Sequence, residues 1–498
     1  MDTTVLSQKS KLGQFCVSFY GRLLQLENWL QIGELTLEYD SQLQLHPLFD
    51  REGVALGIIL GVLIDTEQSR VVIGNVCLDV GANDPDLAQE VENQVYRYSG
   101  SWILILETEN YSRIYLDPCG SLSLVYLSDK SVAASTTGLL LDDQAYVDNF
   151  DQGLYEALGV EKNGWFPAGL TAHHGVKRLL ANHYLDLRSR QTKRHWPRQD
   201  FTSTLPLSKA AERISQLITA AVEAMKNDGP TVLAITGGKD SRMLLAGCRN
   251  SLANIDLITM DLPGSERDVY LAKKVTALGK EMKHSVLPCI LASREERQTW
   301  RYKASHCVGG NNQYYSPSLK PLARYKYFIS GICAEVGRGF LWRDTDYADL
   351  HIDTAELLAR FGLKRHPRLD EPLANWANGV RSFNCYTVLD LAYTELRVSA
   401  WAYAHAYAYA CKGSTTEISP FNSREIIEIF FSLAPEYRRS GAYIQEGISM
   451  MWPELLTIPF NRYGDPRDYW ETIKALSDPA RVASKARKIA GRRLTARK

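Results

Sequence analysis

One short segment constrains this chain more than any other, because it combines a buried strand, a glycine turn and a helix. Residues 231–235 (Thr-Val-Leu-Ala-Ile) have the apolar character of a buried strand, and residues 242–246 (Arg-Met-Leu-Leu-Ala) continue as a helix. Between them stands the loop Thr236–Ser241, Thr-Gly-Gly-Lys-Asp-Ser. Two glycines let the backbone turn tightly and approach a ligand, while the helix N-terminus offers unpaired N–H groups. The segment therefore predicts an anion-binding site.

The side chains of this loop indicate phosphate together with a cation. The hydroxyls of Thr236 and Ser241 can donate to phosphate oxygens, whereas Asp240 would repel phosphate unless a cation lay between them, so Mg²⁺ is expected. The spacing of Gly237 and Gly238 matches neither the Walker A pattern nor the dinucleotide-binding G-x-G-x-x-G. The alternative is a plain strand-to-helix turn that Asp240 caps.

Strands and helices alternate from Pro230 onward. Apolar runs predict strands at Thr231–Ile235, Ile255–Met260 and Tyr327–Ser330, and helical spacing predicts helices at Asp240–Cys248 and Asp268–Leu278. Such alternation is typical of a parallel sheet with helices on both faces. Residues 385–452 are predicted to be mostly helical, including the alanine and aromatic stretch 400–410.

The first 190 residues follow a different pattern, in which short β-branched and aromatic runs are broken by turn residues. Val54–Ile64, Val71–Leu78, Trp102–Leu106 and Arg113–Leu116 predict an antiparallel sheet, the last two as a hairpin. A turn-rich stretch near 197–205 precedes a helical pattern at 208–226. We therefore expect an N-terminal domain over 1–200 and a second domain over 205–470.

Composition excludes several classes of protein. The 498 residues carry 57 basic and 57 acidic side chains, so no global charge indicates nucleic acid. The longest apolar run, Val54–Ile64, is about half of the ~20 residues that a membrane helix needs, and no membrane span is expected. The first ten residues lack the apolar core of a signal peptide, which makes the cytoplasm the expected location. The nine cysteines stand singly, which argues against zinc, iron–sulfur and disulfide frameworks.

A basic tail is expected over 478–498. It carries no acid after Asp478 and eight basic residues: Arg481, Lys485, Arg487, Lys488, Arg492, Arg493, Arg497 and Lys498. A run of like charge is usually a solvated end of the chain, and binding to an acidic partner or a membrane surface is the alternative.

The loop Thr236–Ser241 resembles the S-G-G-x-D-S loop of the N-type ATP pyrophosphatases, which holds the pyrophosphate of ATP while AMP is transferred to a substrate. The segment 260–275, Met-Asp-Leu-Pro-Gly-Ser-Glu-Arg-Asp-Val-Tyr-Leu-Ala-Lys-Lys-Val, is similar to the L-P-G-S turn and helix of asparagine synthetases. This resemblance implies that Ala234 and Met260 contact the adenosine of ATP, and that the second domain has the ATP-pyrophosphatase fold with an added helical section.

A third segment, 330–340, is similar to the synthetase pattern S-G-x-G-x-D-E-x-x-G-G-Y. The resemblance implies that Ser330 and Gly331 belong to the nucleotide site. The metal-binding Asp of the family falls on Glu335, and the Glu that follows it falls on Val336. Glu335 is therefore expected to hold the metal with Asp240, unless a further ligand comes from elsewhere or activity is impaired.

The helical section carries a fourth resemblance. Glu395-Leu-Arg397, Trp401 and the segment 417–423 are similar to the section that ends in the synthetase E-x-R-x-P-F-L-D. Amide-forming members place a lysine beyond that point, which helps stabilise negative charge, but no lysine lies between Asn422 and Lys474. Arg438 or its neighbour Arg439 is expected to supply the charge, and a solvated helix end is the alternative for both.

The first domain resembles, in outline, the glutaminase half of these synthetases, an antiparallel sandwich of the N-terminal-nucleophile type. Gly100–Ile105, Leu116–Gly120 and Gly175–Tyr184 carry this similarity. The family nucleophile is an N-terminal cysteine, but residue 2 is Asp and Cys16 lies far inside the chain, so no glutaminase is expected. β-Lactam synthetases and lasso-peptide cyclases share this loss, although Ile332 stands where β-lactam synthetases carry a Tyr.

The sequence leaves three functional hypotheses open. The first is a ligase that adenylates a carboxylate with ATP, releases pyrophosphate and passes the acyl group to an amine or ammonia. The amine is ammonia from a partner glutaminase, free ammonia, or an amine on the substrate or a second molecule, and a homodimer is a further candidate assembly. The second is another ATP pyrophosphatase such as an RNA-modifying enzyme, and the third is a non-catalytic nucleotide-binding pseudo-synthetase.

Overall fold

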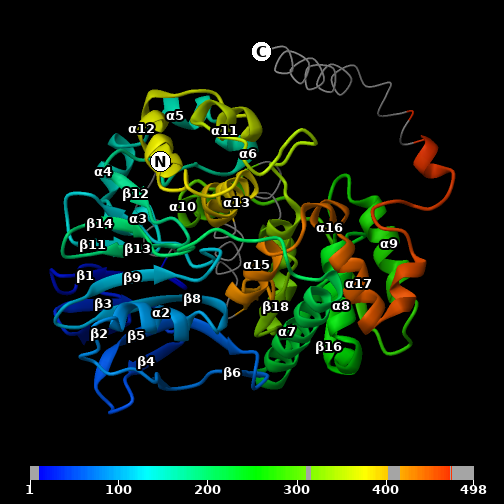
Figure 1. Cartoon of the computed structure of the whole chain (residues 1–498), viewed down its shortest axis with the longest axis horizontal. Coiled ribbons are helices and arrows are strands. Elements are labelled where there is room, and N and C mark those ends of the chain that lie inside the picture. The colour runs from blue at the N-terminus through cyan, green and yellow to red at the C-terminus, as the bar shows by residue number, and fades with distance from the viewer. Residues whose placement is uncertain (1–10, 310–315, 402–414, 471–472, 474–498) are drawn as a thin grey trace.

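The first half of the chain forms two sheets that pack face to face. The computed structural model describes residues 11–309, 316–401, 415–470 and 473 (Figure 1). One sheet is antiparallel, in the order β12 (Val176–Arg178), β10 (Val125–Leu127), β11 (Val132–Ala134), β1 (Phe15–Ser18), β3 (Leu35–Tyr39) and β2 (Asn28–Ile32).

The second sheet is larger and mostly antiparallel. Its order is β14 (Gln191–Arg194), β13 (His183–Asp186), β9 (Ser112–Leu116), β8 (Ser99–Glu107), β5 (Ala55–Asp65), β4 (Leu45–Phe49) and β7 (Val76–Cys77), and β6 (Arg70–Val71) pairs with β5. Strands β4 and β7 run parallel. The hairpin expected from residues 102–116 is present as β8 and β9, with Ile105 opposite Ile114.

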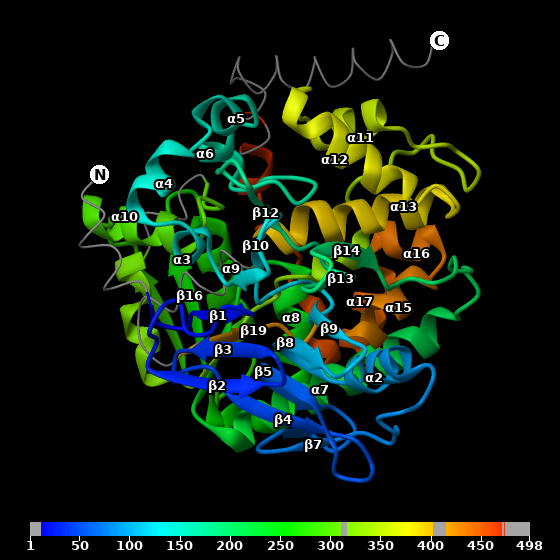
Figure 2. The same cartoon turned by 90° about the vertical axis from the view of Figure 1, so that its left-hand side faces the viewer.

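Alternating side chains explain why these sheets form two apolar layers. Ile58, Leu60, Ile103 and Ile105 of the second sheet pack against the first sheet, for example on Leu37. The opposite face of the second sheet is covered by the helix α2 (Leu87–Val95), as Figure 2 also shows. The expected antiparallel layers are therefore present.

Residues 71–78 differ from the single strand expected there. The structure divides them between the two short strands β6 and β7. Gly74 between them has a φ of 80°, a left-handed conformation that interrupts an extended strand and that glycine adopts readily. The strand prediction was wrong because the apolar run hid this turn.

A five-stranded parallel sheet dominates the second half. Its order is β17 (His284–Pro288), β16 (Ile255–Asp261), β15 (Thr231–Ala234), β18 (Tyr327–Ile329) and β19 (Thr416–Ile418). The three strands expected from the sequence are the central ones. The two edge strands were missed because they are short and lack a continuous apolar run.

Helices and 3₁₀ turns cover this sheet and continue beyond it (Figure 1). They comprise α7 (Leu207–Asp228), α8 (Lys239–Gly247), α9 (Glu266–Thr276), α10 (Arg294–Lys303), α11 (Thr354–Phe361), α12 (Pro367–Asn378), α13 (Cys385–Leu391), α15 (Arg424–Phe431), α16 (Pro435–Ser440) and α17 (Ala442–Met451). Shorter helices are α3 (Thr137–Leu140), α4 (Asp143–Asp148), α5 (Gln152–Ala157), α6 (Val160–Asn163) and the 3₁₀ helices η1 (Arg249–Asn254), η3 (Ser316–Arg324), η4 (Ala334–Arg338) and η6 (Pro453–Thr457).

The two faces of the parallel sheet are covered differently. Leu233 and Leu257 point into a large core that includes α7, α8 and α17. Val232 and Ile258 pack on the other face against Leu322 of η3. The sheet is thus enclosed on both sides, as the alternating pattern predicts. A π-helical turn, η5 (Ala392–Val398), extends α13, and π turns often occur at functional positions.

Polar contacts join the two halves of the chain. Asn422 follows β19 and is 1% exposed; its Nδ2 donates to the Gly100 carbonyl (2.7 Å) and to Asp117 Oδ1 (2.8 Å). Its Oδ1 accepts from the Cys119 N–H (3.0 Å). Arg194 forms a buried ion pair with Glu395 of η5. These bonds join the segment after β19 to β8 and to the residues that follow β9, and they join η5 to β14.

Two expected features lie mainly or wholly outside the described residues. These are residues 402–410 of the alanine and aromatic stretch, and the basic tail at 478–498. No helix in the described part of the chain is long and apolar enough to cross a lipid bilayer.

Candidate nucleotide site

The Thr236–Ser241 loop lies at the carboxyl end of β15, the middle strand of the parallel sheet. The strand ends at Ala234 and α8 begins at Lys239, with Gly238 at the N-cap position. No side chain caps this helix, so the N–H groups of its first turn stay available to a ligand. The carboxyl edge of a parallel sheet is where ligands of such folds bind.

Hydroxyl groups hold the loop in shape. Thr236 Oγ1 and Ser241 Oγ lie 3.0 Å apart, and Ser241 Oγ accepts from the Thr236 N–H at 3.2 Å. The Gly238 N–H donates to Thr236 Oγ1 at 3.2 Å. The two hydroxyls that sequence analysis assigned to phosphate therefore also close the loop on itself, which preorganises it before a ligand arrives.

Gly237 packs closely against α9. A Cβ at this position would lie 2.5 Å from Leu271 Cδ1, closer than real contacts allow. Its N–H donates to Asp268 Oδ1 of α9 at 3.0 Å, and its carbonyl accepts from Arg242 Nη2 at 3.2 Å. Arg242 is fully buried and also donates to the Pro459 carbonyl at 2.6 Å. The loop is thus clamped between α9 and the segment that follows α17.

The second expected segment forms a compact turn beside the loop. Ser265 Oγ accepts from the Leu262 N–H at 2.8 Å and lies 3.1 Å from the Met260 carbonyl, to which it donates. Ala234 and Met260 lie on the adjacent strands β15 and β16 and are partly buried against the same cluster. Both positions assigned to adenosine therefore lie at the carboxyl ends of neighbouring strands, as the loop does.

The third expected segment meets the loop directly. Gly331 follows β18, and a Cβ there would lie 3.1 Å from Asp240 Cβ. Ser330 Oγ is buried and makes no hydrogen bond, although the Ser330 N–H donates to the Ile418 carbonyl at 3.2 Å. The structure therefore brings Ser330 and Gly331 to Asp240, 90 residues earlier in the chain.

Asp240 and Glu335 are close enough to influence each other. Burial raises the pKa of the Asp240 carboxyl, and the nearby Arg338 and Lys239 charges oppose that rise. Burial likewise raises the pKa of Glu335, and the Asp240 charge raises it further. Asp240 Oδ2 accepts from Arg338 Nη2 at 2.8 Å, whereas its Oδ1 is buried without a partner. The two expected metal ligands are thus near enough for their charges to interact.

Arg438 lies behind this site. Its buried guanidinium forms an ion pair with Asp390 (2.6 Å) and donates to the carbonyls of Val336 (3.0 Å) and Gly337 (3.3 Å). It also lies over the Trp342 ring at 4.5 Å. These contacts use all three nitrogens of the guanidinium and hold the backbone of η4 in place. The structure therefore gives Arg438 a positioning contact with the backbone next to Glu335.

Two other cations face the carboxylates, and sequence analysis missed both in this role. Arg338 contacts Asp240 directly, and Lys239 Nζ donates to the Ser440 carbonyl at 2.7 Å. Burial lowers the pKa of Lys239, and the Arg338 charge lowers it further. The only sequence signal was the lysine within the loop itself, since Arg338 becomes a neighbour of Asp240 only in the fold.

Tyr443 and Arg397 complete the surroundings. The Tyr443 hydroxyl is buried without a partner, close to Gly337, where an added Cβ would lie 2.5 Å from it. Burial and the Asp240 charge raise the pKa of Tyr443, so it stays a neutral donor. Arg397, on the π-helical turn, lies over the rings of Trp165 and Trp401 at 5.3 and 5.1 Å.

Unpartnered polar atoms gather at this point. Asp240 Oδ1, Ser330 Oγ, Arg338 Nε, Arg397 Nη1 and the Tyr443 hydroxyl are buried without a hydrogen-bond partner, as are other side-chain atoms throughout the described chain. Buried polar atoms are nearly always paired in folded proteins, and exceptions mark functional sites or missing ligands. Asp240 and Arg338 meet at the Thr236–Ser241 loop, which also presents a helix N-terminus, and this combination makes the loop the candidate site.

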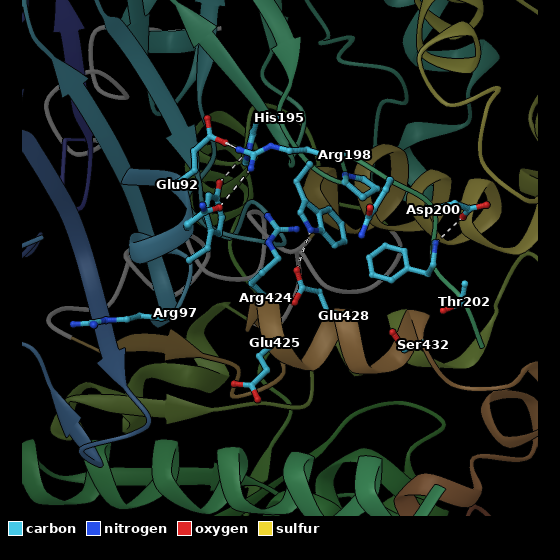
Figure 3. A pocket seen from close by; sticks show the side chains of 16 residues that line it. Glu92, Arg97, His195, Arg198, Asp200, Thr202, Arg424, Glu425, Glu428 and Ser432 are labelled. Atoms are coloured by element: carbon cyan, nitrogen blue, oxygen red, sulfur yellow. Dashed lines mark hydrogen bonds and ion pairs between the residues drawn. The ribbon is translucent and has the colours of Figure 1, made fainter. Parts of the chain in front are cut away.

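A separate cavity of about 790 Å³ lies between α2, the segment 195–202 and α15 (Figure 3). Glu92 contacts Arg198 at 2.6 Å, and the indole N–H of Trp196 donates to Glu428 at 3.1 Å. The Arg424 guanidinium lies over the Trp196 ring at 3.9 Å. None of the residues expected at the nucleotide site lines this cavity.

No protein-family model matches the chain, and no curated protein sequence matches it. The residues and their geometry are therefore the basis for inferring function.

Proposed function

We propose that this chain is an ATP-dependent ligase of the asparagine synthetase type, which adenylates a substrate carboxylate and transfers the acyl group to an amine or ammonia. The observation that carries the proposal is a glycine loop at an uncapped helix N-terminus, where Asp240 keeps one carboxylate oxygen without a hydrogen-bond partner. Such a loop favours phosphate groups, and donors held in place before reaction stabilise the charge that develops on pyrophosphate.

Each loop residue has a specific part in the proposed reaction. The free N–H groups of the first turn of α8 bind the phosphates of ATP, and Gly237 and Gly238 let the backbone approach them. Lys239 and Arg338 provide positive charge beside the leaving pyrophosphate. Since Thr236 ties its hydroxyl to Ser241, the loop needs little rearrangement on binding.

The residues present fit Mg²⁺. Mg²⁺ is commonly bound by one or two carboxylates together with substrate phosphates and water. Asp240 and Glu335 provide two neighbouring carboxylates, and Asp240 Oδ1 has no other partner. No group of three or more His, Cys, Asp and Glu side chains gathers as a metal site within the described ranges, so phosphate oxygens would complete the set. A bound Mg²⁺ would neutralise charge on the leaving pyrophosphate.

The second candidate is a pseudo-synthetase that binds nucleotide without turnover. One observation favours it: Arg338 already neutralises Asp240 through an ion pair at 2.8 Å, which competes with a metal ion. In addition, the apolar Val336 is buried where the related family has an acid. This candidate shares the nucleotide site and differs only in the chemical step.

Calorimetric titration of ATP tests the shared part of both candidates. Wild-type protein should bind ATP more tightly with Mg²⁺ than with EDTA, and Asp240→Asn should lose most of that difference. Asp349→Asn, an exposed aspartate of the same half, is the matched control. ATP binding with equal affinity in wild type and Asp240→Asn, with or without Mg²⁺, would contradict the assignment of Asp240.

A further inference from the structure

The cavity between α2, the segment 195–202 and α15 is separate from the nucleotide site and holds charges of both signs. Its volume of about 790 Å³ lies in the range of small-molecule sites. Figure 3 shows Arg424 and Glu428 pointing from α15 toward the segment 195–202, whereas Glu425 points to the opposite side of the helix. Arg424 and Glu428 are four residues apart and therefore share one helix face.

Arg424 is a buried cation of this cavity. Its side chain belongs to a residue that is 6% exposed, and its guanidinium stacks on the rings of Trp196 at 3.9 Å and Tyr96 at 4.5 Å. Nη1 donates to Asn182 Oδ1 at 2.9 Å, whereas Nη2 is buried without a hydrogen-bond partner. The neighbouring Tyr96 hydroxyl is neutral, because burial raises its pKa. A buried cation that contacts only neutral groups favours an anion beside it.

The other charged groups that line the cavity do not supply that anion, because each has a partner of its own. Glu92 pairs with Arg198 at 2.6 Å, Glu425 pairs with Arg213 of α7 at 2.5 Å, Asp200 accepts from the Asn384 N–H at 2.7 Å, and Arg97 donates to the Tyr98 hydroxyl at 2.7 Å. Arg424 and Glu428 are therefore the two charged groups of the cavity whose partner has to be sought elsewhere.

Glu428 is the acidic counterpart of Arg424. Its Oε1 accepts from the Trp196 indole N–H at 3.1 Å, and the residue is half-buried. Opposite charges one helical turn apart often pair with each other. Here the guanidinium stacks on the face of the Trp196 ring, while the carboxylate binds the indole N–H of the same ring. Trp196 thus holds a positive and a negative group side by side at one cavity.

We propose that this cavity binds a free α-amino acid, whose carboxylate pairs with Arg424 and whose ammonium group pairs with Glu428. An α-amino acid carries these two charges on neighbouring atoms, and the planar guanidinium suits a carboxylate. Arg424 is the first residue of α15, where the positive end of the helix dipole also favours the carboxylate. The half-buried Phe201 ring, 5.6 Å from the Trp196 ring, offers apolar surface to the ligand side chain.

Calorimetric titration of the full-length protein with each of the common amino acids, without ATP, tests the proposal. We expect at least one of them to bind with a Kd of about 1 mM or below. Its N-acetyl derivative lacks the ammonium charge, and its carboxamide lacks the carboxylate. Each derivative should bind at least about tenfold more weakly than the amino acid itself, because one charged hydrogen bond is lost.

A matched pair of variants locates the site. Glu428→Gln is nearly isosteric and keeps an acceptor for the Trp196 indole, so it should weaken binding about tenfold or more without loss of fold. The control is Glu436→Gln, the same charge change at an exposed acid of α16 outside the cavity, and it should bind as wild type. Circular dichroism of both variants checks that the fold is retained.

Three outcomes would overturn the proposal. The first is the absence of heat from every amino acid at concentrations up to about 10 mM. The second is equal affinity for the amino acid and its N-acetyl derivative, which would assign the cavity to simple carboxylates. The third is equal affinity of the wild type and Glu428→Gln for the amino acid.

Discussion

The contact between Asn422 and Asp117 gives the sharpest prediction about stability. Asn422→Asp is nearly isosteric. It replaces the Nδ2 donor, which lies 2.8 Å from Asp117 Oδ1 in a fully buried position, by a second carboxylate oxygen. The Gly100 carbonyl loses its donor at 2.7 Å as well. Two unit charges about 4 Å apart repel by about 4 kcal/mol at the effective dielectric constant of a protein, and closer carboxylates repel more.

Proton uptake limits this penalty and gives it a pH dependence. Burial already raises the pKa of Asp117 in the wild-type protein, and a second carboxylate would raise it further, so one proton is shared by the pair. An acid whose pKa is raised on folding loses stability as pH increases. The variant should therefore be about 5 kcal/mol less stable than wild type at pH 8, and the difference should shrink by about 1.4 kcal/mol per pH unit on acidification.

Urea unfolding at pH 8, 7 and 6, followed by tryptophan fluorescence, measures this difference. Asn375→Asp is the control, because Asn375 is exposed on α12, and it should stay within about 0.5 kcal/mol of wild type at each pH. A deficit for Asn422→Asp that is below about 1 kcal/mol, or one that does not change with pH, would refute the buried contact between the two halves.

Three further predictions concern the loop and two buried histidines, His173 and His306, whose ring centroids lie 5.8 Å apart. Gly237→Ala should abolish ATP binding in calorimetry with little loss of fold by circular dichroism, because its Cβ would meet Leu271 at 2.5 Å and displace the loop; unchanged affinity would contradict this. Lys239→Gln should weaken ATP binding about tenfold through loss of one charge, while unaltered affinity would remove Lys239 from the site. Burial lowers the pKa of His173 to about 4 and that of His306 to about 3. The stability that the two neutral rings contribute above pH 6.5 should therefore be lost as the pH falls toward those values. A constant urea midpoint from pH 7 to pH 4.5 would contradict the burial of these rings.

The sequence predicted the centre of the second half because its signals are local. An apolar run, two glycines and a helix in succession place β15, the loop and α8 without information from elsewhere in the chain. The alternation that follows predicted the parallel sheet for the same reason. The short edge strands carry too few residues for such a pattern, and Gly74 turned an apparently continuous strand into two.

The side chains around the loop were harder to predict because they converge from distant positions. Ser330 and Gly331 were found through a motif, whereas the partly exposed Arg338 and the buried Tyr443 carry no local sequence signal of a functional role. Arg438 illustrates the converse difficulty. Its position suggested a free charge near the acyl group, but Asp390, 48 residues earlier, pairs with it inside the core.

Exchange of labelled pyrophosphate into ATP tests the central claim most directly. We predict exchange that requires Mg²⁺ and a carboxylate from a broad panel, and that falls at least about a thousandfold in Asp240→Asn but not in Asp349→Asn. Exchange in wild type that persists unchanged in Asp240→Asn would contradict the site. Mg²⁺-dependent ATP binding without exchange for any acid of the panel would contradict the ligase and leave the nucleotide-binding pseudo-synthetase.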